Sequence, residues 1–164
     1  MSLITAVGDD SIANTILSEL EAEGIETKLV HKQANSTSPF TYVIVDTASE
    51  TRTCIHSPGA EYPPTALPTD LLAQLTPALL HCDARNTEAA ILAAKQANAL
   101  SIPVLLDAEK DRPHFKELLP LADYLVTNET FPLAYTGEKT LNAALVKLME
   151  MGRATCIITT QGKK

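Results

Sequence analysis

The stretches IPVLLDAEKDRP, residues 102–113, and ADYLVTNETF, residues 122–131, carry the clearest structural signal in the chain. Each contains a short apolar run, Val104–Leu106 in the first and Tyr124–Val126 in the second, and polar residues follow each run directly. Apolar runs of this length, separated by helical patterns, are typical of parallel strands that are covered on both faces. Ligands of open parallel sheets bind beyond the carboxyl ends of the strands. The polar residues after the two runs therefore mark the expected functional site.

Strand and helix patterns alternate on both sides of this stretch. The spacing predicts strands at residues 4–7, 28–31, 78–82, 102–107, 124–127 and 155–160. It predicts helices from about residue 11 to Gly24, and at 71–75, 87–99, 115–119 and 140–151. Such alternation favours an α/β fold built around a mostly parallel sheet.

Residues 41–57 have a different character. Two β-rich runs, 41–46 and 52–57, flank the polar loop 47–51, and no helix separates them. This pattern predicts a β-hairpin that need not belong to the parallel sheet and that could form a flap. Residues 58–68 contain four prolines and are expected to form a surface connector.

Composition excludes several classes of protein. The chain has 164 residues, which is enough for one domain, and a net charge of −7, which argues against nonspecific nucleic-acid binding. No apolar run approaches the roughly 18 residues of a membrane helix, and the start does not resemble a secretory signal. The three cysteines form no CxxC pair and lie in or beside apolar runs, so we expect buried, reduced thiols and a cytoplasmic protein.

Four polar clusters are candidates for binding or catalysis, and each has a structural alternative. Gly8-Asp9-Asp10 could hold a ligand or cap a helix, and Asp83, Arg85 and Asn86 follow a strand, where Asn86 or Thr87 could instead cap the next helix. Thr160-Gln161-Gly162-Lys163 could present backbone N–H groups to a phosphate or form a plain turn.

The cluster of Asp107, Glu109 and Arg112 is the most suggestive of the four. Two carboxylates and an arginine after a buried strand could place a metal ion and phosphate oxygens, although a surface ion pair is the alternative. The chain contains neither a GxxxxGK[ST] phosphate loop nor a GxGxxG fingerprint, and no serine, cysteine and histidine arrangement indicates covalent catalysis.

Six segments, which follow one another along the chain in the family's order, resemble the PfkB/ribokinase family of carbohydrate kinases. Their residue patterns are most similar to those of the ketohexokinase-like members. They are VGDDSIANTILSELEAEGIET (7–27), SPFTYVIVDTASETRTCIHSPGA (38–60), HCDARNTEAA (81–90), VLLDAEKDRP (104–113), YLVTNETFPLAYTG (124–137) and CIITTQGKK (156–164). The resemblance implies a three-layer α/β/α sheet in a single, partial ribokinase-like domain over residues 1–164, with the 41–57 hairpin as a lid. It also implies ATP-dependent transfer of a phosphoryl group to a sugar hydroxymethyl, with ATP and Mg²⁺ as cofactors and a homodimer formed through the lid.

The resemblance also implies roles for individual residues. Those expected at the substrate are Arg52, Arg85 and Asn86; those at the nucleotide are Asn128 and Gly162; those at Mg²⁺ are Asp107 and Glu109. Asp107, Asn128 and Gly162 are expected at the carboxyl ends of neighbouring strands, on one side of the sheet.

The chain also departs from the family pattern. Phe131 stands where the Asn-x-x-Glu motif has its glutamate, and Ala13 stands where the family usually has glycine. The N-terminal sugar-binding strands and the C-terminal Gly-Ala-Gly-Asp, which carries the catalytic aspartate, have no counterpart, so no catalytic residue is assigned. We therefore expect an incomplete kinase that is inactive alone. The alternatives are a non-catalytic, truncated kinase segment that acts as a binding module, and an unrelated Rossmann-like ligand-binding domain.

Overall fold

The computed structural model describes residues 1–161, and the chain divides into two compact units, Met1–Tyr62 (unit 1) and Pro63–Lys164 (unit 2). Each unit is described by itself below. The assignment of residues 1–164 to a single domain stays a prediction.

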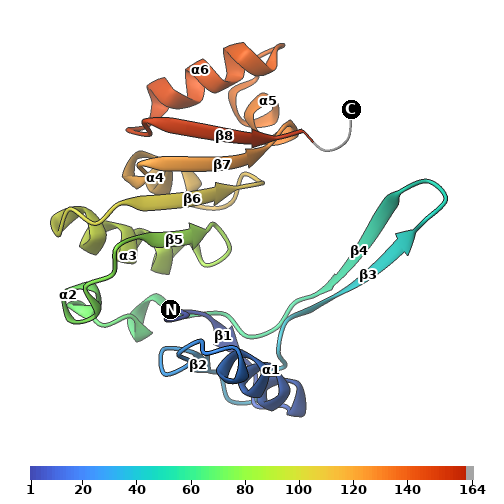
Figure 1. Ribbon diagram of the computed structural model, residues 1–164, viewed down its shortest axis with the longest axis vertical. Helices are drawn as coiled ribbons and strands as arrows, with labels where there is room; N and C mark the ends of the chain where they lie inside the picture. Colours follow the sequence, from blue (N-terminus) through green and yellow to red (C-terminus); the bar gives the residue numbers. More distant parts are fainter. Residues whose placement is uncertain (162–164) are drawn as a thin grey trace. The chain divides into compact units, whose positions relative to one another are not determined.

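Unit 2 is built on a four-stranded parallel sheet (Figure 1). The strands, in their order across the sheet, are β5 (Leu80–Asp83), β6 (Val104–Ala108), β7 (Tyr124–Asn128) and β8 (Cys156–Thr160). The register aligns Asp83 with Asp107 and Asn128 with Thr160. The predicted α/β fold with a mostly parallel sheet is confirmed, and Asp107 and Asn128 lie at the carboxyl ends of neighbouring strands as expected.

The helices of unit 2 connect these strands. They are α2 (Leu71–Leu75), α3 (Thr87–Ala99), α4 (Phe115–Leu118), α5 (Thr130–Thr136) and α6 (Leu141–Met151), with short 3₁₀ turns at Pro64–Ala66 and Leu119–Leu121. Because the strand order follows the chain order, right-handed crossovers carry the connecting helices to the same face of the sheet. Unit 2 therefore supplies the sheet and one helical layer.

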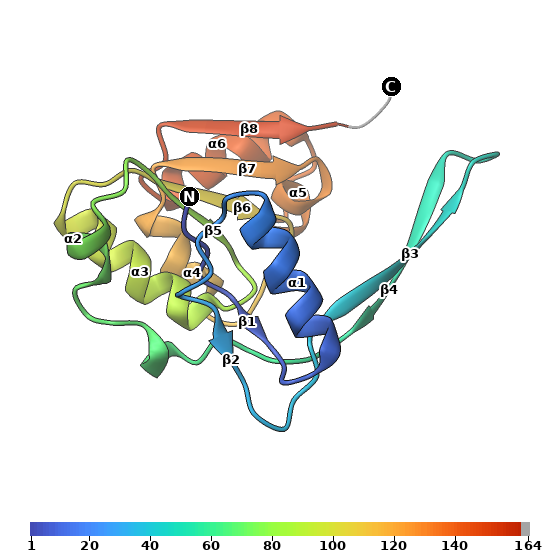
Figure 2. The ribbon, with the colours of Figure 1, turned by 60° about the horizontal axis from the view of Figure 1, so that its bottom comes forward.

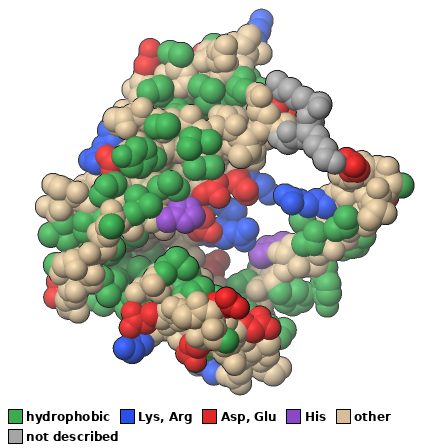
Figure 3. Space-filling view, viewed as in Figure 1, with side chains coloured by type: hydrophobic (Ala, Val, Ile, Leu, Met, Phe, Trp, Pro, Cys, Tyr) green, Lys and Arg blue, Asp and Glu red, His purple; other side chains and the backbone are tan. Residues whose placement is uncertain are grey.

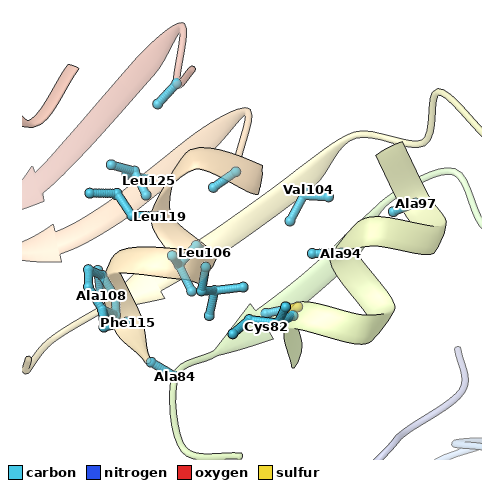
Figure 4. Close-up of a cluster of buried hydrophobic side chains, with 14 of the residues drawn as sticks. Cys82, Ala84, Ala94, Ala97, Val104, Leu106, Ala108, Phe115, Leu119 and Leu125 are labelled. Carbon is cyan, nitrogen blue, oxygen red and sulfur yellow. The ribbon is translucent and has the colours of Figure 1, made fainter. Parts of the chain in front are cut away.

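The core of unit 2 lies between that face and the helices. Val104, Leu106 and Leu125 are fully buried and point toward α3 and α4 (Figure 4). The alternate residues are less covered, and Tyr124 on the opposite face is 40% exposed. This alternation is the period of a strand with one covered face.

Unit 1 contains a smaller α/β motif. Strands β1 (Ala6–Val7) and β2 (His31–Lys32) pair in parallel, and α1 (Ser11–Ala22) lies between them in the chain. The side chain of Asp10 accepts a hydrogen bond from the N–H of Ala13, and Gly24 has φ 74° just after the helix. Capping therefore explains the Gly-Asp turn and Gly24, as one of the two interpretations of the sequence predicted.

The predicted hairpin is a two-stranded ribbon. Strands β3 (Phe40–Asp46) and β4 (Thr51–Ser57) pair antiparallel, from Phe40 opposite Ser57 to Asp46 opposite Thr51, and form a sheet of their own. Figures 1 and 2 both show the ribbon extending away from β1, β2 and α1. Its role as a lid stays a prediction.

Two other expectations need correction. All three thiols are free, as predicted, but only Cys82 is buried, whereas Cys54 and Cys156 are exposed. Cys54 lies on the ribbon, where nearly every residue faces solvent, and Cys156 lies on β8 at the less covered face of the sheet. Helix α5 was not predicted from the sequence. None of the described helices is long and apolar enough to span a membrane.

Candidate functional site

A small polar cavity of about 140 Å³ lies in unit 2 beyond the carboxyl ends of β5 and β6. It is lined by Asp83, Ala84, Arg85, Asp107, Glu109, Lys110 and Arg112. Figure 3 shows acidic and basic side chains gathered next to each other in this region. The parallel pairing of β5 with β6 therefore brings together two of the clusters that the sequence singled out.

Two carboxylates stand side by side in this cavity, because Asp83 and Asp107 are partners across β5 and β6. Asp83 is held by Arg85: one carboxylate oxygen accepts the backbone N–H of Arg85 at 3.1 Å, and the other lies 3.4 Å from the Arg85 Nε. Like charges directly opposite each other destabilise a sheet, so this ion pair offsets part of the repulsion.

Asp107 is in a less favourable environment for a charge. Partial burial raises the pKa of its carboxyl group above 3.8, and the nearby charges of Glu109 and Asp83 raise that pKa further, while His81 lowers it. Burial and neighbouring negative charge both disfavour the ionised form. A cation at Asp107 would relieve this penalty.

Asn128 connects the cavity to the next helix. Its Oδ1 accepts hydrogen bonds from the N–H and hydroxyl of Thr130 at 3.1 and 2.9 Å and from the N–H of Phe131 at 2.8 Å. Its Nδ2 donates to the Glu109 carbonyl at 3.5 Å. Asn128 therefore starts α5 and also fixes the loop that carries Glu109. Its predicted contact with a nucleotide stays a prediction.

The remaining predicted site residues lie in three places. Asn86 is the N-cap residue of α3, directly after the cavity residue Arg85, and makes no side-chain cap hydrogen bond. Arg52 lies on β4 in unit 1, opposite Val45. Gly162 lies outside the residues that the structure describes. Their roles at the substrate and the nucleotide stay predictions.

One lining residue was missed by sequence reasoning. Lys110 contributes a third positive charge to the cavity beside Arg85 and Arg112. The available signal was its place inside the charged run EKDR, which directly follows β6. The cavity therefore joins three carboxylates to three cations.

Phe131 does not belong to the cavity. It is 3% exposed and packs in an aromatic cluster, with ring centroids 5.3 Å from both Phe115 and Tyr135. The backbone of α5 thus directs position 131 into the core, and Glu129 lies exposed just before the helix. At the position where the Asn-x-x-Glu pattern has its glutamate, this chain therefore has a buried core residue.

The cavity suits a metal–phosphate group better than a metal ion alone. Among the described residues, no group of three or more histidine, cysteine, aspartate or glutamate side chains could hold a metal. Mg²⁺ is usually bound through one or two carboxylates together with the phosphates of a substrate. Asp107 and Glu109 could supply the carboxylates, and the three cations could contact phosphate oxygens.

Comparison with known proteins extends this result. The family model described as "pfkB family carbohydrate kinase" matches residues 1–164. A ribokinase-type protein from Agrobacterium tumefaciens has 24% identity and a TM-score of 0.83, over 98% of this chain and 53% of its own. Ribokinase from Giardia lamblia has 23% identity and a TM-score of 0.81, over 99% and 54%. A ribokinase-type protein from E. coli, solved with ATP and Mg²⁺, has 15% identity and a TM-score of 0.78, over 96% and 56%.

These structural neighbours are below 25% identity, so they support the fold alone. The chain spans just over half the length of each of them. The family model, in contrast, covers the whole chain. The chain therefore belongs to the pfkB family of carbohydrate kinases.

Proposed function

We propose that this chain provides the magnesium and phosphate site of an ATP-dependent sugar kinase, which transfers a phosphoryl group to a sugar hydroxymethyl. The observation that carries the proposal is the cavity in which Asp107 and Glu109 lie with Arg85, Lys110 and Arg112. Phosphoryl transfer depends mainly on positioning and on electrostatic stabilisation, and this set of residues can supply both.

The proposal assigns tasks to the residues around the cavity. Asp107 and Glu109 hold Mg²⁺, which neutralises charge on the phosphates when it is bound. The raised pKa of Asp107 favours this role, because a cation stabilises the ionised carboxylate. Asn128 keeps the Glu109 loop in place through its hydrogen bond to the Glu109 carbonyl, and Gly162 lets the backbone approach the nucleotide.

The sugar side of the proposal involves Arg52, Arg85 and Asn86. Arg85 and Asn86 follow β5 at the cavity, and Arg52 is carried by the ribbon of unit 1. In this proposal the ribbon acts as a lid over the sugar. Closing a lid excludes water and strengthens the electrostatic interactions inside the site.

The proposal includes slow turnover by this chain alone. The resemblance assigns the catalytic base to a Gly-Ala-Gly-Asp motif that has no counterpart in the sequence, and a positioned base contributes about 10²–10⁴-fold to the rate. We therefore expect Mg²⁺-dependent ATP binding without rapid sugar phosphorylation.

Calorimetry with ATP, with and without Mg²⁺, and a coupled ADP-release assay with fructose, ribose and other sugars test this function together. Binding that requires Mg²⁺, with little sugar-dependent turnover, is the expected result. Failure to bind ATP with Mg²⁺ present would favour the non-catalytic module instead. Sugar-dependent turnover near one per second that Asp107→Ala abolishes would show that the chain is a complete enzyme.

We also propose that the ribbon pairs with the ribbon of a second copy. The face that carries Arg52 is assigned to the sugar, which leaves the face of Tyr42, Ile44 and Ile55, where these side chains are 54–65% exposed. Exposed apolar patches of this kind are typical of interaction sites, and one patch that faces itself satisfies two-fold symmetry.

Sedimentation equilibrium checks this pairing. Ile44→Lys should weaken the dimer at least tenfold, because it places a charge in the proposed interface. Val43→Lys, on the opposite face of the ribbon, is the matched control and should leave the dimer intact. Equal effects of the two changes, or a wild-type chain that stays monomeric at high concentration, would contradict the proposal.

A further inference from the structure

The ribbon of unit 1 needs support at its base. All residues from Thr41 to His56 are exposed, so the two strands bury little apolar surface of their own. An isolated two-stranded hairpin is marginally stable at best in water. The ribbon's orientation must therefore be fixed by the residues where its two strands join the rest of unit 1.

Ser38, two residues before β3, is the centre of this base. It is completely buried, and all of its polar atoms except the carbonyl contact the turn after β1. Its N–H and its hydroxyl donate to the two oxygens of Asp10, each at 2.8 Å, and its Oγ accepts the N–H of Gly8 at 3.1 Å. Hydrogen bonds to an ionised group are about twice as strong as those between neutral groups.

Two glycines lie in close contact with the backbone of the same segment. A Cβ atom at Gly8 would lie 2.3 Å from the Ser36 carbonyl oxygen, and a Cβ at Gly59, which follows β4, would lie 2.3 Å from the Thr37 carbonyl oxygen. Backbone hydrogen bonds reinforce the contact: Asp9 N–H donates to Ser36 at 3.1 Å, and Ala60 N–H donates to Thr37 at 2.8 Å. The entering and leaving strands are thus fixed at one point.

The carboxylate of Asp10 serves three elements at once. Besides Ser38 it accepts the N–H of Ala13 and so caps α1. These hydrogen bonds, that of the Ser38 N–H first, lower the pKa of Asp10 and so favour its ionised form. One ionised side chain therefore joins the end of β1, the start of α1 and the base of the ribbon.

We infer that Asp10 and Ser38 are positioning residues that hold the ribbon at a fixed angle to β1 and α1, with Gly8 and Gly59 as the close contacts that make this possible. In this inference they act through the ribbon: their side chains bond to each other, to Gly8 and to Ala13. The anchoring itself does not depend on the proposed function. Only the idea that the anchored ribbon covers a sugar rests on that function.

Asp10→Asn separates anchoring from helix capping. Asparagine is as good an N-cap as aspartate, so its amide oxygen can still accept the Ala13 N–H. Its NH₂ group cannot accept the Ser38 N–H, so the anchor is weakened. Hydrogen exchange, which reports local opening, should become at least tenfold faster at the backbone amides of β3 and β4 and change less than twofold in α1. Asp70→Asn, in unit 2, is the control for loss of one negative charge and should change neither.

Ser38→Ala is the second variant, because it removes the hydroxyl and leaves the cap of α1 in place. It should also accelerate hydrogen exchange in the ribbon alone. If Asp10→Asn unfolds unit 1, Ser38→Ala still tests whether the ribbon is anchored through Ser38. Unchanged exchange in the ribbon of both variants would overturn the inference. So would equal acceleration in α1 and the ribbon, because that result would indicate a general loss of stability.

Discussion

Replacing Phe131 by glutamate is expected to unfold unit 2 rather than to complete a metal site. The Phe131 side chain is 3% exposed and packs against both Phe115 and Tyr135. Removing a buried phenylalanine costs about 3–5 kcal/mol, and an unpaired buried carboxylate costs several kcal/mol more. Because whole domains have free energies of unfolding of about 5–15 kcal/mol, this change should remove most of the stability of unit 2.

Urea unfolding followed by circular dichroism measures this effect. Ala134→Glu is the matched control: it adds the same charge at an exposed position of α5 and should change the free energy of unfolding by about 0.5 kcal/mol or less. Phe131→Leu, which keeps an apolar side chain, should cost much less than the glutamate. A stable Phe131→Glu chain that binds Mg²⁺ more tightly than wild type would show that position 131 faces the cavity after all.

The sequence predicted the parallel sheet well because its signal is local. The apolar runs that became β6 and β7 end within one residue of the predicted positions, and α3 spans exactly the predicted residues. Helix α5 was missed because its strongest start signal is not in its own apolar pattern. That signal is the side chain of Asn128, which accepts three hydrogen bonds from the first residues of the helix.

The candidate site was predictable to the level of strand ends and no further. Parallel pairing places the polar residues after β5 near those after β6. The contacts of single atoms depend on packing that the sequence pattern does not contain. The pairing of Asp83 with Arg85 and the bond from Asn128 to the Glu109 loop are of this kind. The exposed Cys54 and Cys156 were mispredicted because an apolar run is not always covered on both faces.

Asp107→Asn should weaken Mg²⁺-dependent ATP binding about 100-fold. Even groups that only orient a metal ligand contribute about 10–100-fold to metal affinity, so loss of a direct carboxylate ligand should reach the upper end of that range or exceed it. Titration calorimetry at saturating Mg²⁺ measures the change. Asp111→Asn is the matched control, because Asp111 is exposed in the same loop and does not line the cavity. It should bind ATP as tightly as wild type does.

The same substitution should stabilise the folded chain in the absence of ligand. The pKa of Asp107 is raised in the folded state, so its ionisation is harder there than in the unfolded chain. This penalty is absent below the ordinary pKa of 3.8, grows as the pH rises and is complete above the folded-state pKa. Asp107→Asn should therefore raise the free energy of unfolding at pH 7, and the gain should disappear near pH 3.

A gain in stability without a loss of Mg²⁺-dependent affinity would show that the ionised Asp107 carboxylate destabilises the fold but that the metal is held elsewhere. A loss of both would show that Asp107 stabilises the fold, contrary to the direction of its pKa shift. The proposal requires that Asp107→Asn raises the free energy of unfolding and weakens Mg²⁺-dependent ATP binding, and that Asp111→Asn does neither. That combination is expected of a carboxylate whose unfavourable environment is relieved by a bound cation.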